Sequence, residues 1–313
     1  MSSMVKKIRI ATRESRLALA QTALVAAALR AHDRAIDVEI VGMTTRGDHV
    51  LDRPLSQVGG KGLFIKELEV ALEEERADIA VHSLKDVPME IAPQFAIATF
   101  GERELPLDAF VSNRHASLEA MPADSLVGTS SLRRECQLRH AYPRLRFAPL
   151  RGNVNTRLAK LDAGDYEAII LAAAGLRRLG LAERIRATLA ESLAIPAIGQ
   201  GILAIEHLAR RHDLAELLGH FELRDVAAAA RAERALGLVV EGSCEVPVAA
   251  HARITGGEIS LEAFLGLPDG TRVLRQRHVG SVTDAQAVGR ALGERLLAAG
   301  GAEILSELTS RDA

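Results

Sequence analysis

The chain has 313 residues, of which 48% are apolar and 26% are charged, so we expect a packed protein of two or three domains. It has 39 lysines and arginines against 41 aspartates and glutamates, and the net charge of −2 argues against a general nucleic-acid binder. Aromatic residues make up only 3%, which disfavours a base-stacking surface. Two cysteines and no export-signal pattern indicate a cytoplasmic protein without a disulfide framework or a membrane span.

Strand and helix patterns alternate over the first hundred residues, which predicts a parallel sheet covered by helices. Ser15 is placed to cap the first helix. The polar, glycine-rich segment 44–62 is long enough to be a lid, with Lys61 near its tip. The expected strands are 7–12, 38–43 and 79–82, and the expected helices are 16–30 and 63–75.

A second strand–helix series follows the charged segment 101–108, which contains Pro106 and is the first expected hinge. Ser131 and Asn153 are placed to cap two helices of this series. Segment 195–201 is expected to cross back, so that a strand at 202–206 rejoins the first sheet. The expected strands of the second series are 109–112, 125–128, 145–149 and 168–172, and its helices run to about 140 and 163.

The last ninety residues have a different pattern, in which glycine and proline turns separate three strands of an antiparallel meander. We therefore predict two α/β domains with crossing segments and a C-terminal α+β domain with a three-stranded antiparallel sheet. The strands are expected at 246–253, 259–265 and 273–280, with helices at 223–236 and 285–299 and a short one after 302. The predicted domains are 1–101 plus 202–219, 107–195 and 223–313.

Arginines recur at three junctions, 127–134, 150–157 and 174–178, where an apolar run is followed by a helical pattern. A helix start offers free backbone N–H groups and a partial positive charge, and a guanidinium beside it can bind a carboxylate or a phosphate. Any single arginine could be an ordinary surface residue. Three such junctions within about fifty residues favour a ligand that carries many negative charges.

Lys85 and Asp86 lie directly after an expected strand, at the edge where ligands of open α/β sheets bind. Asp86 could support a cationic intermediate while Lys85 holds an anionic group, or the two could be a solvated ion pair in a turn. His82 is expected to be a packed, hydrogen-bonded residue. Cys244, in a loop between glycine and proline, could react with a strong electrophile or be passively buried, whereas Cys136 is expected to be structural.

Taken in order, these segments resemble the porphobilinogen deaminase family over nearly the whole chain. One departure is Ser243, where many relatives place glycine. The resemblance implies that the first two domains are arranged like a periplasmic binding protein. It is carried by Ile10–Ser15, Val58–Phe64, His82–Pro88, Gly128–Arg134, Leu150–Asn153, Gly199–Gly201 and the loop around Cys244.

The resemblance implies a transferase that condenses four porphobilinogen molecules head to tail and releases ammonia at each step. The growing chain is built on a dipyrromethane cofactor joined to Cys244 through a thioether, and water then frees hydroxymethylbilane for porphyrin and heme biosynthesis. The resemblance also implies a monomer without a metal. The main alternative is a non-catalytic, two-lobed anion-binding protein, which the pairing of Asp86 with Cys244 disfavours; a nucleic-acid regulator is a more distant one.

The resemblance further implies a role for each matching residue. Asp86 is expected to be catalytic, because a carboxylate stabilises the positive charge that develops when ammonia leaves. Each pyrrole unit bears an acetate and a propionate, which accounts for the many arginines. The expected cofactor contacts are Cys244, Ser83, Lys85, Asp86, Thr129, Ser131, Arg133 and Arg134. The expected contacts of porphobilinogen and the growing chain are Arg13, Ser15, Gln21, Lys61, Ser130, Arg151, Arg157 and Arg178.

Overall fold

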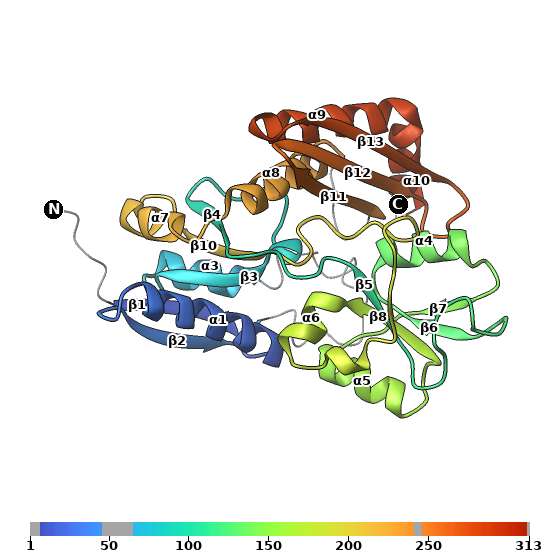
Figure 1. Ribbon diagram of the computed structural model, residues 1–313, viewed down its shortest axis with the longest axis horizontal. Helices are drawn as coiled ribbons and strands as arrows, with labels where there is room; N and C mark the ends of the chain where they lie inside the picture. Colours follow the sequence, from blue (N-terminus) through green and yellow to red (C-terminus); the bar gives the residue numbers. More distant parts are fainter. Residues whose placement is uncertain (1–6, 46–64, 241–245, 312–313) are drawn as a thin grey trace. The chain divides into compact units, whose positions relative to one another are not determined.

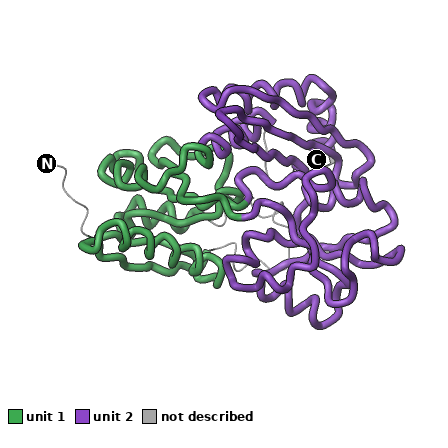
Figure 2. The backbone as a smooth tube through the Cα atoms, in the orientation of Figure 1, with its two compact units in different colours: residues 1–104, 201–227 green, residues 105–200, 228–313 purple. Residues whose placement is uncertain are grey.

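The computed structural model describes residues 7–45, 65–240 and 246–311 (Figure 1). The chain divides into two compact units, with residues 1–104 and 201–227 in unit 1 and residues 105–200 and 228–313 in unit 2 (Figure 2). Two of the divisions fall inside the segments that the sequence marks as crossings. The expected three-domain boundaries stay a prediction. No helix in the described ranges is both long enough and apolar enough to cross a membrane.

Unit 1 is built on a five-stranded sheet of order β2-β1-β3-β10-β4. Strand β1 runs parallel to β2 and β3, as expected, but β10 runs antiparallel to both β3 and β4. The expected return of this strand to the first sheet through the second crossing segment is confirmed, and its antiparallel direction is a feature that the sequence pattern did not predict. The elements are β1 (Lys7–Arg13), α1 (Arg16–His32), β2 (Asp37–Met43), α3 (Lys66–Glu73), β3 (Ile79–Ser83), a 3-10 turn η3 (Leu84–Asp86), β4 (Phe95–Phe100), β10 (Leu203–Leu208) and α7 (His212–Gly219).

Helices cover both faces of this sheet because its strands carry apolar residues on both faces. Ile8 and Ile10 of β1 pack in one cluster with α1 and α7, whereas Ala11 packs in another with α3. The first helix begins where the sequence predicts, since Ser15 Oγ accepts a hydrogen bond from the N–H of Ala18 at 3.3 Å. These contacts fix the edge of the sheet from which β1 and β3 lead into their following segments.

The first part of unit 2 is a second five-stranded sheet, of order β7-β6-β8-β5-β9. Helix α4 packs on one face and helices α5 and α6 on the other, around Phe110 and Ile170 on the first face and Ile169 and Leu171 on the second. The elements are β5 (Asp108–Val111), β6 (Leu126–Gly128), α4 (Leu132–Ala141), β7 (Arg146–Ala148), α5 (Val154–Asp162), β8 (Ala168–Ala172), α6 (Ala173–Arg178), a 3-10 turn η4 (Ala182–Arg184) and β9 (Ala187–Thr188).

The second part of unit 2 is an antiparallel meander of order β11-β12-β13, covered by α9. Its Ala249 and Phe264 pack against Cys136 of α4 and against Ile195, which joins the two parts of the unit. The elements are α8 (Arg224–Val239), through which the unit division passes, β11 (Val248–Thr255), β12 (Glu258–Gly266), β13 (Val273–Ser281), a 3-10 turn η5 (Val282–Asp284), α9 (Ala285–Leu296), a π-helical turn η6 (Leu297–Gly301) and α10 (Ala302–Arg311).

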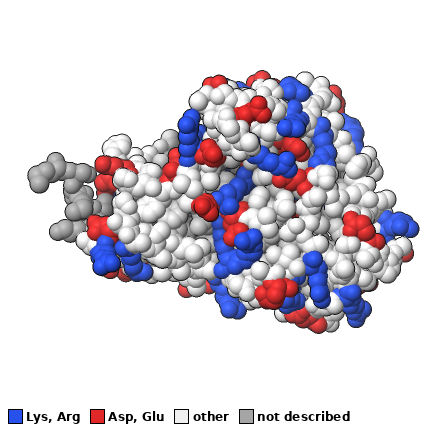
Figure 3. Space-filling view, in the orientation of Figure 1, with Lys and Arg blue, Asp and Glu red and all other residues white. Residues whose placement is uncertain are grey.

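The fold class predicted from the sequence is confirmed. Two mixed α/β sheets of five strands each and a C-terminal three-stranded antiparallel sheet are all present. The face drawn in Figure 3 carries acidic and basic side chains interspersed with each other, in keeping with the nearly neutral net charge.

Candidate functional site

The carboxyl end of β3 leads straight into the short turn η3, which carries Lys85 and Asp86. Leu84 and Val87 are buried on either side of these two residues. The N–H of Leu84 donates to Ile202 O at 3.0 Å, and the N–H of Val87 donates to Leu84 O at 3.1 Å. Buried neighbours and backbone hydrogen bonds thus hold a half-buried lysine and an exposed carboxylate at the sheet edge, where ligands of α/β sheets bind.

Four further predicted residues lie at this edge of unit 1. Ser83 ends β3, and its Oγ accepts a hydrogen bond from Nε2 of the buried Gln21 of α1 at 2.7 Å. Arg13 ends β1, which is parallel to β3, so both strands present their carboxyl ends at the same edge. The structure therefore brings Gln21 and Ser83 into contact and sets Arg13 and Ser15 at the same sheet edge.

His82 lies inside unit 1 and not among the exposed groups of the edge. Its Nε2 is 3.0 Å from Oε2 of Glu206 on β10, and both side chains are buried. The expectation of a packed, hydrogen-bonded histidine is confirmed. The pair joins β3 to β10 from the side chains as well as through the backbone ladder.

The first arginine junction, in unit 2, begins with three hydroxyl residues whose hydrogen bonds fix the chain between β6 and α4. Thr129 Oγ1 accepts from the N–H of Ser131 at 3.2 Å, and Ser130 Oγ donates to Leu150 O at 2.8 Å. Ser131 caps α4, as predicted, because its Oγ accepts from the N–H of Arg134 at 3.4 Å. Of the three, Thr129 is buried and Ser130 is exposed.

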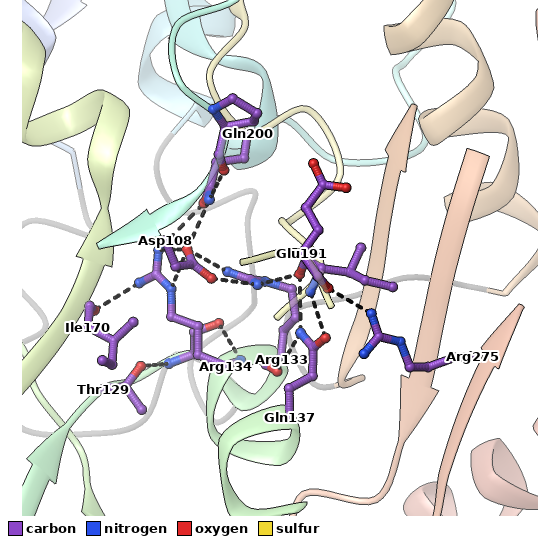
Figure 4. Close-up of polar contacts among 12 residues, drawn as sticks. Asp108, Thr129, Arg133, Arg134, Gln137, Ile170, Glu191, Gln200 and Arg275 are labelled. Atoms are coloured by element: carbon purple, nitrogen blue, oxygen red, sulfur yellow. Dashed lines mark hydrogen bonds and ion pairs between the residues drawn. The ribbon is translucent and has the colours of Figure 1, made fainter. Parts of the chain in front are cut away.

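Arg133 and Arg134, in the first turn of α4, both bind the carboxylate of Asp108 at the start of β5 (Figure 4). Arg133 places Nη1 2.8 Å from Oδ2 and Nη2 3.0 Å from Oδ1. Arg134 places both Nε and Nη2 2.9 Å from Oδ1. The carboxylate is fully buried, and the arginine side chains are 5% and 7% exposed. One anion thus lies between two cations inside unit 2.

Backbone carbonyls and the side chain of Gln200 complete this cluster. Arg133 Nη1 donates to Ile195 O at 2.7 Å, and Arg134 Nη1 donates to Ile170 O at 3.1 Å. Gln200 Nε2 donates to Asp108 Oδ1 at 2.9 Å, and its Oε1 lies 3.5 Å from Arg134 Nη2. The same amide also donates to Pro106 O at 2.5 Å, so the cluster is tied to residues of both crossing segments.

The cluster carries an excess of one positive charge. Burial opposes ionisation of Asp108, but the charges of Arg133 and Arg134 outweigh it and hold the pKa of this carboxyl well below its ordinary value. Burial lowers the pKa of Arg133. Its Nε–H has no hydrogen-bond partner among the described residues, and neither has Oδ2 of Asp108, which meets Arg133 only as an ion pair. A buried donor without a partner beside an unmatched cation fits an anionic group, such as a carboxylate of the implied cofactor.

The second junction lies between β7 and α5. Asn153 caps α5 as predicted, accepting from the N–H of Thr156 at 3.0 Å. Gly152 has φ 108°, and a Cβ there would lie 2.7 Å from the side chain of Thr156, so only glycine fits without strain. Arg157 Nε donates to Gly152 O at 2.7 Å, and Arg151 is half-buried. This junction therefore has the expected form of a capped helix start flanked by arginines.

The third junction differs from its prediction. Helix α6 spans only Ala173–Arg178 and begins directly after β8, so Arg177 and Arg178 lie in its last turn and not at its start. The helix-start argument is wrong here, because the apolar run that the sequence shows continues into the helix. Whether Arg178 contacts substrate stays a prediction.

Lys61 and Cys244 lie outside the described residues. The other cysteine, Cys136, is fully buried in α4, and burial raises its thiol pKa to about 12, which matches the structural role expected for it. Sequence reasoning missed Asp108 and the hydrogen bonds of Gln200. The signal for Asp108 was a single carboxylate at the head of the apolar run Asp108–Val111, since such a residue in a buried strand requires a cationic partner.

Comparisons with known proteins agree with this arrangement. The model of the porphobilinogen deaminase dipyrromethane cofactor binding domain matches residues 8–216, and that of the porphobilinogen deaminase C-terminal domain matches residues 227–298. Porphobilinogen deaminase of Burkholderia thailandensis is 56% identical over 309 residues, covering 98% of this chain and 94% of that protein. That of Ralstonia nicotianae is 54% identical over 306 residues, covering 96% of this chain and 92% of the relative.

Among solved structures, the periplasmic VFT2 domain of BvgS from Bordetella pertussis has 15% identity and a TM-score of 0.43, covering 68% of this chain and 86% of that domain. This similarity is too low to indicate a function. The two family models and the nearly full-length relatives show the family directly, and the chain belongs to the porphobilinogen deaminase family.

Proposed function

We propose that this enzyme carries its dipyrromethane cofactor on Cys244 through a thioether and uses Asp86 as the catalytic carboxylate. It is a transferase that condenses four porphobilinogen molecules head to tail with loss of ammonia and then releases hydroxymethylbilane. The observation that supports the catalytic assignment is the position of Lys85 and Asp86 on a turn fixed at the carboxyl edge of the first sheet.

The role of Asp86 follows from the charge that the reaction creates. Loss of ammonia from porphobilinogen leaves a cationic electrophile, and an ionised carboxylate nearby lowers the free energy of the transition state that leads to it. Asp86 is exposed at the end of a turn that backbone hydrogen bonds hold to the sheet, so its carboxylate can meet substrate without rearrangement of β3. Lys85 beside it supplies a cation for a carboxylate of the cofactor.

The arginines bind the acetate and propionate groups of cofactor and substrate. We assign Arg133 and Arg134 to the cofactor, together with Ser83, Thr129 and Ser131, and their buried excess charge supports this. The growing chain gains carboxylates with each condensation, so further cations are needed for it. The proposed contacts of substrate and growing chain are Arg13, Ser15, Gln21, Lys61, Ser130, Arg151, Arg157 and Arg178.

The choice of Cys244 over Cys136 for cofactor attachment rests on burial. Cys136 has no exposed surface, and its raised pKa leaves almost no thiolate near neutral pH. The match to the C-terminal domain of the family, residues 227–298, includes Cys244. The thiol of Cys244 attacks the electrophilic methylene carbon that ammonia leaves, forming the carbon–sulfur bond as the thiol proton is lost.

Intact mass spectrometry of the purified protein tests the attachment. We expect the native protein to be heavier than its sequence by two linked pyrrole units, and Cys244→Ala to have its bare sequence mass. Cys136→Ala is the matched control and should keep the adduct. A native protein without added mass would favour the non-catalytic anion-binding alternative, and an adduct that survives Cys244→Ala would exclude this thiol.

Turnover measurements test Asp86 separately. Asp86→Asn should keep the adduct mass and the native melting temperature but reduce the rate of hydroxymethylbilane formation by roughly 10²–10⁴-fold, the usual range for loss of such a group. Glu90→Gln, a change of an exposed carboxylate four residues further on, should keep the native rate. A near-native rate in Asp86→Asn would rule out the catalytic role. The cytoplasmic setting and the monomeric state stay predictions.

A further inference from the structure

The Asp108 cluster contains a carboxylate that the assignments above do not use. The carboxylate of Asp108 accepts hydrogen bonds from the guanidinium groups of both Arg133 and Arg134, the two residues that we assign to the cofactor. It does so where all three side chains are at least nine-tenths buried. The carboxylate of Asp108 and the carboxylates of the cofactor would therefore form ion pairs with the same two arginines.

The net charge of Asp108, Arg133 and Arg134 determines how strongly the two arginines attract a further carboxylate. With Asp108 ionised, the cluster has a net charge of +1, which one ligand carboxylate can balance. Without Asp108 the two guanidiniums would carry +2 in a buried site, which is costly until anions arrive. Coulomb interactions are strong in a buried site because the effective dielectric constant is low. Adding one positive charge to the cluster therefore strengthens its attraction for a ligand carboxylate, and removing one weakens it.

We propose that Asp108 is an internal counter-ion that competes with the cofactor carboxylates for Arg133 and Arg134. It stabilises the chain before the cofactor is attached, and it limits how much the cofactor stabilises the chain afterwards. This inference rests on the proposed function, since it takes Arg133 and Arg134 as cofactor contacts. Asp108 is a positioning residue and not a catalytic one, because it acts through the two arginines.

The test measures how far the melting temperature of the cofactor-loaded protein lies above that of the same protein carrying Cys244→Ala. This difference is called the gap below. Four versions set the cluster charge: Asp108→Asn gives +2, the native cluster +1, Asp108→Asn with Arg134→Gln +1, and Arg134→Gln 0. We expect the gap to follow this order, widening by about 3–6 °C for each added positive charge. Intact masses confirm which proteins are loaded.

Asp78→Asn is the matched control. Asp78 in unit 1 is also shared by two arginines, Arg9 and Arg211, but none of the three is assigned to the cofactor. This variant should lower the melting temperature of both forms equally and leave the gap unchanged. A purely structural role for Asp108 predicts the same behaviour for Asp108→Asn, so the gap distinguishes competition from general stabilisation.

An equal or narrower gap in Asp108→Asn would overturn the inference and leave the proposed function intact. If Asp108→Asn does not fold without the cofactor, the pair in the Arg134→Gln background decides. Removing Asp108 there raises the cluster charge from 0 to +1 and must widen the gap, and no widening would overturn the inference. A native protein of bare sequence mass would instead defeat the proposed function and this inference with it.

Discussion

Each unit contains one aspartate shared by two arginines, and the two clusters differ in burial. In unit 1, Arg9 donates to Asp78 at 2.9 and 3.0 Å, and Arg211 donates to it at 3.2 Å. Those arginine side chains are 32% exposed and the aspartate 9%. Asp108 of unit 2 is fully buried, with arginines that are almost completely enclosed. The same kind of aspartate–arginine cluster is therefore partly exposed to water in unit 1 and buried in unit 2.

The clusters also differ in charge balance. Arg211 has a second anion, Asp213, at 2.7 and 2.9 Å, so two arginines face two carboxylates in unit 1. In unit 2, Asp108 is the only carboxylate among the described residues that pairs with the two arginines. Burial acts to raise the pKa of both carboxyls, but hydrogen bonds from Arg9 and Arg211 hold the pKa of Asp78 low, and the charges of Arg133 and Arg134 hold that of Asp108 low. The unmatched buried charge, and not the presence of an arginine pair, is therefore the feature on which we base the proposal of a ligand site in unit 2.

The largest expected effect is on the buried cluster. In the Cys244→Ala background, Asp108→Asn should lower the free energy of unfolding by about 3–5 kcal/mol, because it leaves two buried guanidiniums without their anion. Urea denaturation measures this change. A loss below 1 kcal/mol would mean that the arginines reach solvent when Asp108 is absent, and the contrast with unit 1 would fail.

The pH dependence of the same pair of proteins sharpens the comparison. The folded-state pKa of Asp108 is lowered, so its contribution to stability is complete above the unfolded value near 3.9 and is lost as the pH falls toward the folded value. The difference in unfolding free energy between Asp108 and Asp108→Asn proteins should therefore shrink by about 2 kcal/mol from pH 5 to pH 2. A difference that grows on acidification would reverse the assigned sign.

The partly exposed cluster should matter less. Asp78→Asn removes charged hydrogen bonds to Arg9 and Arg211, but both side chains keep access to water and Arg211 keeps its bonds to Asp213. We expect a loss of about 1–2 kcal/mol, below that of Asp108→Asn, again from urea denaturation. Equal losses in the two variants would show that burial does not separate the clusters.

The sequence predicted the features that depend on neighbouring residues. Ser15, Ser131 and Asn153 cap their helices because a hydroxyl or amide before a helical pattern satisfies free N–H groups two or three residues on. The turn with Lys85 and Asp86 was likewise readable, from an apolar strand that stops before a proline. Local patterning alone determines such elements.

Features that depend on distant pairings were not predicted. Asp108 lies 25 residues before Arg133. Its place at the head of an apolar run indicates that it needs a cationic partner, but the local sequence does not show that this partner is the arginine pair of α4. Strand β10 enters the first sheet antiparallel because of the path of the crossing segments, which strand patterns do not record. The last-turn position of Arg178 follows from the shortness of α6.

Peptide mapping of the native protein tests the central claim most directly, namely that the dipyrromethane cofactor is attached to Cys244. Trypsin places the two cysteines on separate peptides, residues 235–253 for Cys244 and residues 135–139 for Cys136. We predict the added mass of two linked pyrroles on peptide 235–253 and the bare mass for peptide 135–139. Two unmodified peptides, or an adduct on the peptide of Cys136, would contradict the account.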